Sequence, residues 1–190
     1  MRARLIEDRE HYEVLINDAI RRAEVSVWIA TANVKGMMIE APRGTAARAR
    51  GRYVSILDCF DDLVKRRVEL RLLHAGAPSR AFSEELARRP RLRDGAKGLA
   101  MRRCPRVHLK VIAVDGRLLY LGSANFTGAG LGAKGEGRRN FEMGIVTEDD
   151  VLLDAVQARF DKIWRGDECK GCRLRDVCPR PLDRAPRPQR

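Results

Sequence analysis

Apolar and polar residues alternate along the first half of the chain in blocks that predict helices and strands in turn. Residues 7–24 carry apolar side chains at helical spacing, and the β-branched run EVSVWIATA at 24–32 predicts a strand. A second helix is expected over about 53–67, followed by the strand VELRLLHA at 68–75. Strand, helix and strand in this order predict a crossover unit with a parallel strand pair.

The second half predicts a hairpin, a further strand and a long helix. Two apolar runs within residues 107–125 surround an Asp-Gly dipeptide, which is typical of a two-residue hairpin turn. NFEMGIVT at 140–147 predicts a strand, and residues 151–164 predict an amphipathic helix. Segments 35–52 and 78–106 lack such periodicity and are expected to be loops. Together these elements predict an α/β domain.

The composition adds a strong positive charge. Among 190 residues, 38 Lys and Arg face 26 Asp and Glu, which gives a formal net charge of +12, and basic residues crowd the segments 43–52 and 88–106. This charge favours a polyanionic partner, either nucleic acid or an anionic membrane surface. A basic face that is merely solvated is the alternative.

The N-terminal residues and the length of the apolar runs bear on where in the cell the protein is expected. The N-terminus is charged from the start, and no apolar run approaches the length of a membrane span. We therefore expect a cytoplasmic protein without a membrane anchor. The five cysteines are then expected to be thiols or metal ligands, because disulfides are rare in that compartment.

Polar side chains of the predicted hairpin indicate a reactive site. If residues 115–116 form a two-residue turn, counting outward along the strands places His108 opposite Ser123. Alternate residues share a face, so four polar side chains would project to one side: His108, Lys110, Ser123 and Asn125. An imidazole, a cation and two hydrogen-bonding groups suit a phosphate, because they can attack phosphorus and stabilise its oxygens.

The same residues resemble a known signature. H-x-K-x4-D from His108 to Asp115, followed by G-S-x-N at 122–125, resembles the motif of the phospholipase D superfamily. The resemblance spans about residues 8–165 and implies an αβα sandwich around a mixed central β-sheet. It implies that one histidine attacks phosphorus to form a phosphohistidine, while a second protonates the leaving oxygen and then activates water.

The resemblance also implies a role for each candidate residue. His108 is nucleophile in one motif copy and acid/base in the other, Lys110 and Asn125 hold the phosphate, and Ser123 supports them. Glu142 matches the acidic residue that orients the histidine. Asp115 completes the candidate catalytic set, either as a structural partner near the turn or as a plain turn residue.

The chain contains one copy of the motif, so a two-histidine mechanism implies a homodimer with the site on its two-fold axis and no catalytic metal. The expected function is a nuclease acting on DNA or RNA, most simply an endonuclease. A cardiolipin-type phospholipid hydrolase and a catalytically idle nucleic-acid-binding subunit are the alternatives. Four basic residues are candidates for binding the substrate: Arg102, Arg103, Arg106 and Arg138.

A cysteine triplet follows the predicted catalytic domain. CKGCRLRDVC, which contains Cys169, Cys172 and Cys178, resembles the triplet that holds a [4Fe–4S] cluster in RecB-type exonucleases together with one upstream cysteine. Cys104 or Cys59 would be that fourth ligand. Structural zinc and free thiols are the alternatives.

The domain organisation predicted from these features has three parts. A catalytic domain occupies residues 1–166, a Cys-rich metal-binding segment occupies 167–180, and a disordered basic tail occupies 181–190. His11 and His74 lie outside the motif and are expected to be structural or surface residues.

Overall fold

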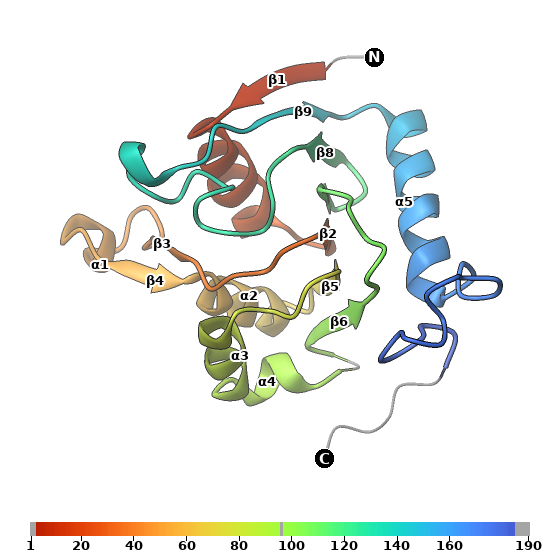
Figure 1. The fold of residues 1–190 in the computed structure, drawn as a ribbon. Coiled ribbons are helices and arrows are strands. Elements are labelled where there is room, and N and C mark those ends of the chain that lie inside the picture. Colours follow the sequence, from red (N-terminus) through yellow and green to blue (C-terminus); the bar gives the residue numbers. More distant parts are fainter. Residues whose placement is uncertain (1–2, 96, 185–190) are drawn as a thin grey trace.

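A seven-stranded mixed sheet forms the centre of the computed structural model, which describes residues 3–95 and 97–184 (Figure 1). The sheet has the order β1-β9-β8-β7-β2-β5-β6, in which β5 runs parallel to β2 and β6 and the other neighbours are antiparallel. The predicted parallel pair is thereby confirmed. The strands are β1 (Ala3–Glu7), β2 (Ser26–Thr31), β5 (Glu69–His74), β6 (Leu99–Arg103), β7 (Val111–Val114), β8 (Leu118–Gly122) and β9 (Met143–Thr147). A separate ribbon pairs β3 (Met38–Glu40) with β4 (Tyr53–Ser55).

Helices cover both faces of the sheet, which confirms the αβα sandwich. One core cluster lies under the helices η1 (Tyr12–Ala19), η2 (Ile20–Arg22), α2 (Ile56–Lys65), α3 (Arg80–Ala87) and α4 (Pro90–Arg93). The second core cluster lies under α5 (Asp150–Arg165) on the other face (Figure 1). Two short helices, α1 (Ala46–Ala49) and η3 (Glu136–Arg138), lie in loops.

Local signals explain where the long helices begin and end. Ser55 caps α2 in a capping box, since its hydroxyl accepts from the Leu57 amide and Asp58 accepts from the Ser55 amide. Asp149 caps α5 in a similar way, and Gly166 ends that helix with a φ of +86°. The helices expected over 53–67 and 151–164 are therefore confirmed, with small shifts at their ends.

Both outer strands of the sheet were missed by the sequence analysis. β1 buries only Ile6 among its five residues, and β6 buries only Leu99. An edge strand has one neighbour and much exposed surface, so its sequence lacks the apolar alternation of a central strand. The segment 78–106 was expected to be a loop, yet it also forms α3 and α4.

The predicted hairpin is present, but its predicted register is wrong by one residue. Val114 pairs with Leu118, so residues 115–117 connect β7 to β8 where two residues were expected. One extra connecting residue shifts every pair along the ladder. His108 therefore does not lie opposite Ser123, and pairing across the hairpin cannot be what brings the candidate residues together.

The C-terminal part of the described chain is more ordered than expected. Leu182 lies in the segment predicted to be disordered, yet it is buried in the second core cluster. The remainder of that predicted tail, residues 185–190, lies outside the described residues. Within the described chain, no helix is both long and apolar enough to span a bilayer.

Candidate active site

The candidate catalytic residues gather at one edge of the sheet because of the direction of its strands. His108 and Lys110 immediately precede β7, Ser123 and Asn125 follow β8, and Glu142 precedes β9. Since β8 is antiparallel to both β7 and β9, these three strand ends meet at the same edge. All five residues lie just outside these strands, and among the described residues no hydrogen bond or ion pair joins His108 or Lys110 to Ser123, Asn125 or Glu142.

His108 and Lys110 are in direct contact. Lys110 Nζ lies 3.1 Å from Nε2 and 3.2 Å from Nδ1 of His108, and it donates to the His108 carbonyl oxygen at 3.0 Å. Because Nζ is almost equally far from both ring nitrogens, it lies against the ring as a whole and not along the lone pair of one nitrogen. His108 is exposed. The pair thus places an imidazole ring and an ammonium group side by side at the surface.

Hydrogen bonds from β2 and the residues after it set the orientation of the Asn125 amide. Asn125 Oδ1 accepts from the Asn33 backbone amide at 3.1 Å and from the Thr31 hydroxyl at 3.3 Å. Because the Asn33 backbone amide can only donate, the amide oxygen must face it, and the Asn125 NH2 group faces the other way. The side chain is half-buried, which leaves these two N–H donors available to an anion.

Ser123 and Glu142 form a second pair at the edge. Ser123 Oγ donates to Glu142 Oε2, and Asn140 Nδ2 donates to Glu142 Oε1 at 2.9 Å. The Glu142 backbone amide donates to Asp8 Oδ1 at 3.0 Å. Among the described residues, no hydrogen bond joins Glu142 to His108, so the orienting role implied for Glu142 stays a prediction.

A buried chain of hydrogen bonds supports the backbone between Ser123 and Asn125. The Ala124 amide donates to Tyr120 OH at 3.2 Å, and Tyr120 OH lies 3.0 Å from His11 Nε2. His11 Nδ1 lies 3.1 Å from the Asp8 carbonyl, which can only accept, so Nδ1 carries the proton and Nε2 accepts from tyrosine. Burial lowers the pKa of His11 and raises that of Tyr120 to about 12, which keeps both neutral.

Two glycines make room for the Tyr120 ring. Gly122 and Gly144 pair directly across β8 and β9, and a Cβ atom on either would overlap Tyr120. The ring can therefore lie across the two strands only because both positions lack a side chain.

Several supporting residues were not singled out from the sequence. Thr31, Asn33 and Asn140 contact candidate residues, and His11 was expected only to be structural or at the surface. Thr31 and Asn33 are polar residues at the end of a strongly apolar strand, and this signal could have identified them. His11, the side-chain partner of Tyr120, lies 109 residues from it in sequence, so no local pattern marks this pair.

Asp115 is separated from this edge, which corrects its place in the candidate catalytic set. It lies in the turn at the far end of β7, and its carboxylate accepts from the backbone amides of Glu24, Val25 and Ser26 at 2.7 to 3.1 Å. Burial alone would raise the pKa of Asp115, but these hydrogen bonds outweigh it and lower the pKa. Asp115 ties the hairpin turn to the start of β2.

The four candidate arginines differ in what they contact. Arg102 donates to the carbonyl oxygens of Trp164 and Leu182, so its guanidinium anchors the C-terminal segment. Arg103 donates to the Ala75 carbonyl at 2.9 Å, and Arg106 lies 3.6 Å from Cys172 Sγ. Arg138 is exposed in η3, in the loop before Glu142. Arg103, Arg106 and Arg138 remain exposed to solvent, whereas Arg102 is largely committed to protein contacts.

The basic segments also use part of their charge internally. Arg48 pairs with Glu40, Arg89 with Asp58 at 2.6 Å, and Arg91 with Asp61 at 2.7 Å. These ion pairs reduce the positive charge that the two segments present to a partner.

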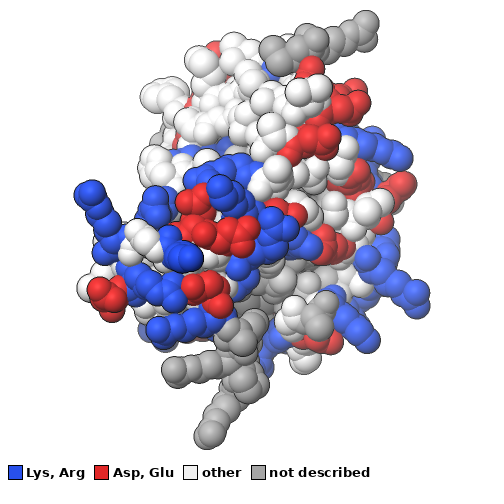
Figure 2. All heavy atoms as spheres, turned by 90° about the vertical axis from the view of Figure 1, so that its right-hand side faces the viewer, with Lys and Arg blue, Asp and Glu red and all other residues white. Residues whose placement is uncertain are grey.

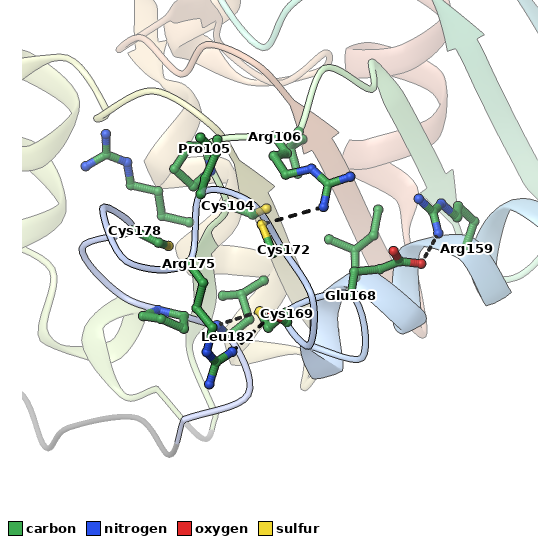
Figure 3. A pocket seen from close by; sticks show the side chains of 15 residues that line it. Cys104, Pro105, Arg106, Arg159, Glu168, Cys169, Cys172, Arg175, Cys178 and Leu182 are labelled. Carbon is green, nitrogen blue, oxygen red and sulfur yellow. Dashed lines mark hydrogen bonds and ion pairs between the residues drawn. The ribbon is translucent and has the colours of Figure 1, made fainter.

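Four of the five cysteines lie together, away from the hydrophobic core under α2. Cys104 follows β6 and lines the same pocket as Cys169, Cys172 and Cys178, which follow α5 (Figure 3). Cys59 instead packs in α2 against the first core cluster, where burial raises the pKa of its thiol to about 11. Of the two candidates for a fourth ligand, only Cys104 is placed beside the triplet.

Comparisons with solved structures identify the same fold elsewhere. Nuc, a phospholipase D family member from Salmonella typhimurium, aligns with a TM-score of 0.57 at 18% identity, covering 86% of this chain and 94% of its own. NucT from Helicobacter pylori aligns with a TM-score of 0.55 at 16% identity, covering 85% and 94%. Phosphatidylserine synthase from Haemophilus influenzae aligns with a TM-score of 0.52 at 15% identity, covering 85% and 38%.

Sequence comparison assigns the family. No curated protein sequence matches the chain. The family model described as "Cardiolipin synthase, PLD-like domain" matches residues 16–164, which include the strands of the sheet from β2 to β9 and every candidate catalytic residue. The match covers well over half of the chain, and the fold agrees with it, so the chain belongs to the phospholipase D superfamily.

Proposed function

We propose that the protein is a phosphodiester hydrolase, specifically a metal-independent endonuclease that cleaves DNA or RNA as a homodimer. The observation that carries this proposal is the arrangement at the sheet edge. The His108 imidazole touches the Lys110 ammonium, and the Asn125 amide directs its N–H donors away from the Asn33 amide. These groups together suit attack on a phosphate.

In the proposed reaction, a ring nitrogen of His108 attacks phosphorus, and the bond from phosphorus to the leaving oxygen breaks. His108 of the partner subunit donates a proton to that oxygen and then removes a proton from a water molecule. The resulting hydroxide attacks phosphorus and breaks the bond to His108. Lys110 and Asn125 donate hydrogen bonds to the phosphate oxygens, whose charge they stabilise, so the reaction needs no metal.

Exposed apolar side chains near the site support the homodimer. Phe141 is 96% exposed, Met143 55% and Leu5 52%, and Leu5 and Met143 lie on adjacent strands, β1 and β9. Large apolar side chains grouped at a surface favour association with another protein surface. Figure 2 shows a mostly uncharged upper region on the side that carries α5, at the height of β1 and β9 in Figure 1. With one motif per chain, a second copy is the partner that completes a two-histidine site.

Charge and the comparisons support nucleic acid as substrate. The chain keeps a net charge of +12, and Figure 2 shows basic side chains spread over the middle and lower parts of the same side, mixed with acidic ones. Contacts with backbone phosphates dominate nucleic-acid binding. An archaeal chromatin protein, TrmBL2, described as binding DNA, shares the fold with a TM-score of 0.53 at 13% identity. We expect this activity in the cytoplasm.

A phospholipid substrate is the second candidate. The matching family model carries a cardiolipin synthase description, and phosphatidylserine synthase shares the fold. Both descriptions concern phosphodiesters of lipids, whose reacting group is the same. Only a direct comparison of substrates separates the two candidates.

The test is a substrate panel at low salt in EDTA, containing single- and double-stranded DNA, RNA, and vesicles with cardiolipin. We expect cleavage of nucleic acid, with turnover lowered more than about 1,000-fold in His108→Ala while binding persists. Lys110→Ala should lose activity similarly, whereas Lys65→Ala, which removes an exposed lysine from the end of α2, should not. Cleavage that requires added Mg²⁺, or a fully active His108→Ala protein, would contradict the proposal.

A further inference from the structure

The four clustered cysteines come from two segments that are far apart in sequence. Cys104 lies in the loop between β6 and His108, while the other three lie within eighteen residues that follow α5. All four line one pocket, which Figure 3 shows from close by. Thiols gathered in this way are typical of metal–sulfur sites.

The spacing of the side chains and the size of the pocket bear on whether a zinc ion or a larger metal centre could bind here. No three of the described His, Cys, Asp or Glu side chains are close enough to hold one metal ion. A zinc ion bonds sulfur at about 2.3 Å, so its four thiolates must lie within about 4 Å of one another. The pocket has a volume of about 90 Å³, and on the same measure one water molecule needs only about 10–15 Å³. This space leaves room for a group of several atoms beside the thiols.

Positive charge and hydrogen-bond donors surround the sulfur atoms. Arg106 Nη1 lies 3.6 Å from Cys172 Sγ, and the Leu182 backbone amide donates to Cys169 Sγ at 3.3 Å. Arg103, Arg159 and Arg175 also line the pocket, where Arg159 pairs with Glu168 at 2.5 Å and Arg175 with Asp183 at 2.7 Å. Four thiolates carry a large negative charge when they bind a metal, and hydrogen bonds to sulfur together with cationic neighbours stabilise that charge.

The C-terminal segment forms a loop closed at its neck. It leaves α5 at Gly166 and returns there, so that a Cβ atom at Gly166 would overlap the backbone of Leu182 and Asp183. Arg102 holds the neck by donating to the Trp164 and Leu182 carbonyls. Residues 167–184 are all described and form neither helix nor strand. A loop of this length with little apolar core of its own needs another source of order, and a metal centre is a common one.

We propose that Cys104, Cys169, Cys172 and Cys178 ligate a [4Fe–4S] cluster. Each thiol loses its proton to solvent and binds one iron atom, with no change of oxidation state required of the protein. The cluster joins the C-terminal loop to the segment between β6 and β7. Since Cys104 lies only four residues before His108, the cluster also restrains the segment that leads into the candidate active site. This proposal does not depend on which substrate the enzyme cleaves.

The test is metal analysis of the full chain purified without oxygen from cells supplied with iron and sulfide. We expect about four irons with a matching amount of acid-labile sulfide per chain, and a broad absorbance near about 400 nm that dithionite bleaches. One zinc per chain, or protein that holds no metal after this preparation, would overturn the cluster.

Cysteine variants test the ligand set. Cys104→Ser and Cys172→Ser should each lose most of the iron and the visible absorbance, while the control Cys59→Ser should keep both because Cys59 packs in α2. Circular dichroism and gel filtration must show that the iron-free variants remain folded; if they unfold, removal of iron by chelator from the oxidised wild-type protein replaces them. Full cluster content in Cys104→Ser, or its loss in Cys59→Ser, would overturn the assignment.

Discussion

At Asn125, a hydrogen bond from the Asn33 backbone amide decides which end of the side-chain amide faces the substrate. The Asn33 amide donates to Oδ1, and the Thr31 hydroxyl lies between Oδ1 and the Asn33 carbonyl, so the NH2 group is the end that faces away from β2. Asn125 therefore acts in the proposed reaction through its N–H donors, and Thr31 and Asn33 act by positioning it.

Asn125→Asp tests this role with almost no change of shape. The carboxylate keeps an acceptor for Asn33 and Thr31 but replaces the two N–H donors by an oxygen that repels phosphate. We expect turnover to fall about 100-fold or more with little change in melting temperature. Steady-state kinetics and thermal unfolding measure both effects. Asn17→Asp in η1 is the control and should leave turnover unchanged; an equally active Asn125→Asp protein would remove Asn125 from the reaction.

Asp115 belongs to the stability of the fold rather than to the chemistry. Because folding lowers its pKa, ionised Asp115 stabilises the folded state above its unfolded pKa of about 4, and this stabilisation is lost as the pH falls through the lower folded pKa.

Asp115→Asn should therefore lower the free energy of unfolding by about 1–2 kcal/mol at pH 7, with activity per folded molecule retained. Asparagine also tolerates the φ of +55° at this position, so the change removes charge without adding backbone strain. Urea unfolding between pH 7 and pH 3 measures the difference, which should close only below about pH 4. A difference that vanishes by pH 6 would show that another group is responsible.

At the scale of elements, the two facing glycines of β8 and β9 admit the Tyr120 ring that supports Ala124. Gly144→Ala would place a methyl group where that ring lies. We expect a loss of about 2–3 kcal/mol in the free energy of unfolding, measured by denaturant titration. Gly137→Ala is the control, because its Cβ would meet nothing within 4 Å, and it should change stability by less than about 0.5 kcal/mol. Equal stability of the two variants would contradict this packing account.

At the scale of the whole molecule, a site shared by two chains has consequences that a monomeric site does not. If each site needs His108 from both subunits, wild-type chains paired with His108→Ala chains are inactive. After wild-type and variant chains are mixed in equal amounts and have exchanged subunits, one quarter of the dimers contain two wild-type chains. The mixture should then have about one quarter of the activity of an equal mass of pure wild-type protein, whereas independent sites would leave about one half. Steady-state assays of the mixtures distinguish these outcomes.

The dimer surface can be tested separately. Leu5→Glu adds charge to the exposed face of β1 and should lower the dimer fraction and the activity together, as followed by analytical ultracentrifugation. Val25→Glu is the matched control. Val25 is also exposed, but it lies beside the turn between β7 and β8, at the strand ends opposite to those that carry the candidate site. A Leu5→Glu protein that remains dimeric would place the interface elsewhere.

The sequence by itself determined the central elements and the reactive residue types. β2, α2, β5 and α5 follow from apolar periodicity over short stretches, because burial of one face requires that spacing. The motif residues that precede β7 and follow β8 were visible for a similar reason, since their spacing is local.

Only the tertiary structure decided features that depend on distant neighbours. The edge strands β1 and β6 form by pairing with β9 and β5, and no local sequence pattern predicts this pairing. Whether an arginine is free or engaged, as at Arg102, depends on carbonyls more than sixty residues away. The choice of Cys104 over Cys59 beside the cysteine triplet is of the same kind. Local spacing fixes what a segment can form, whereas pairing, register and side-chain partners depend on how the whole chain closes its core.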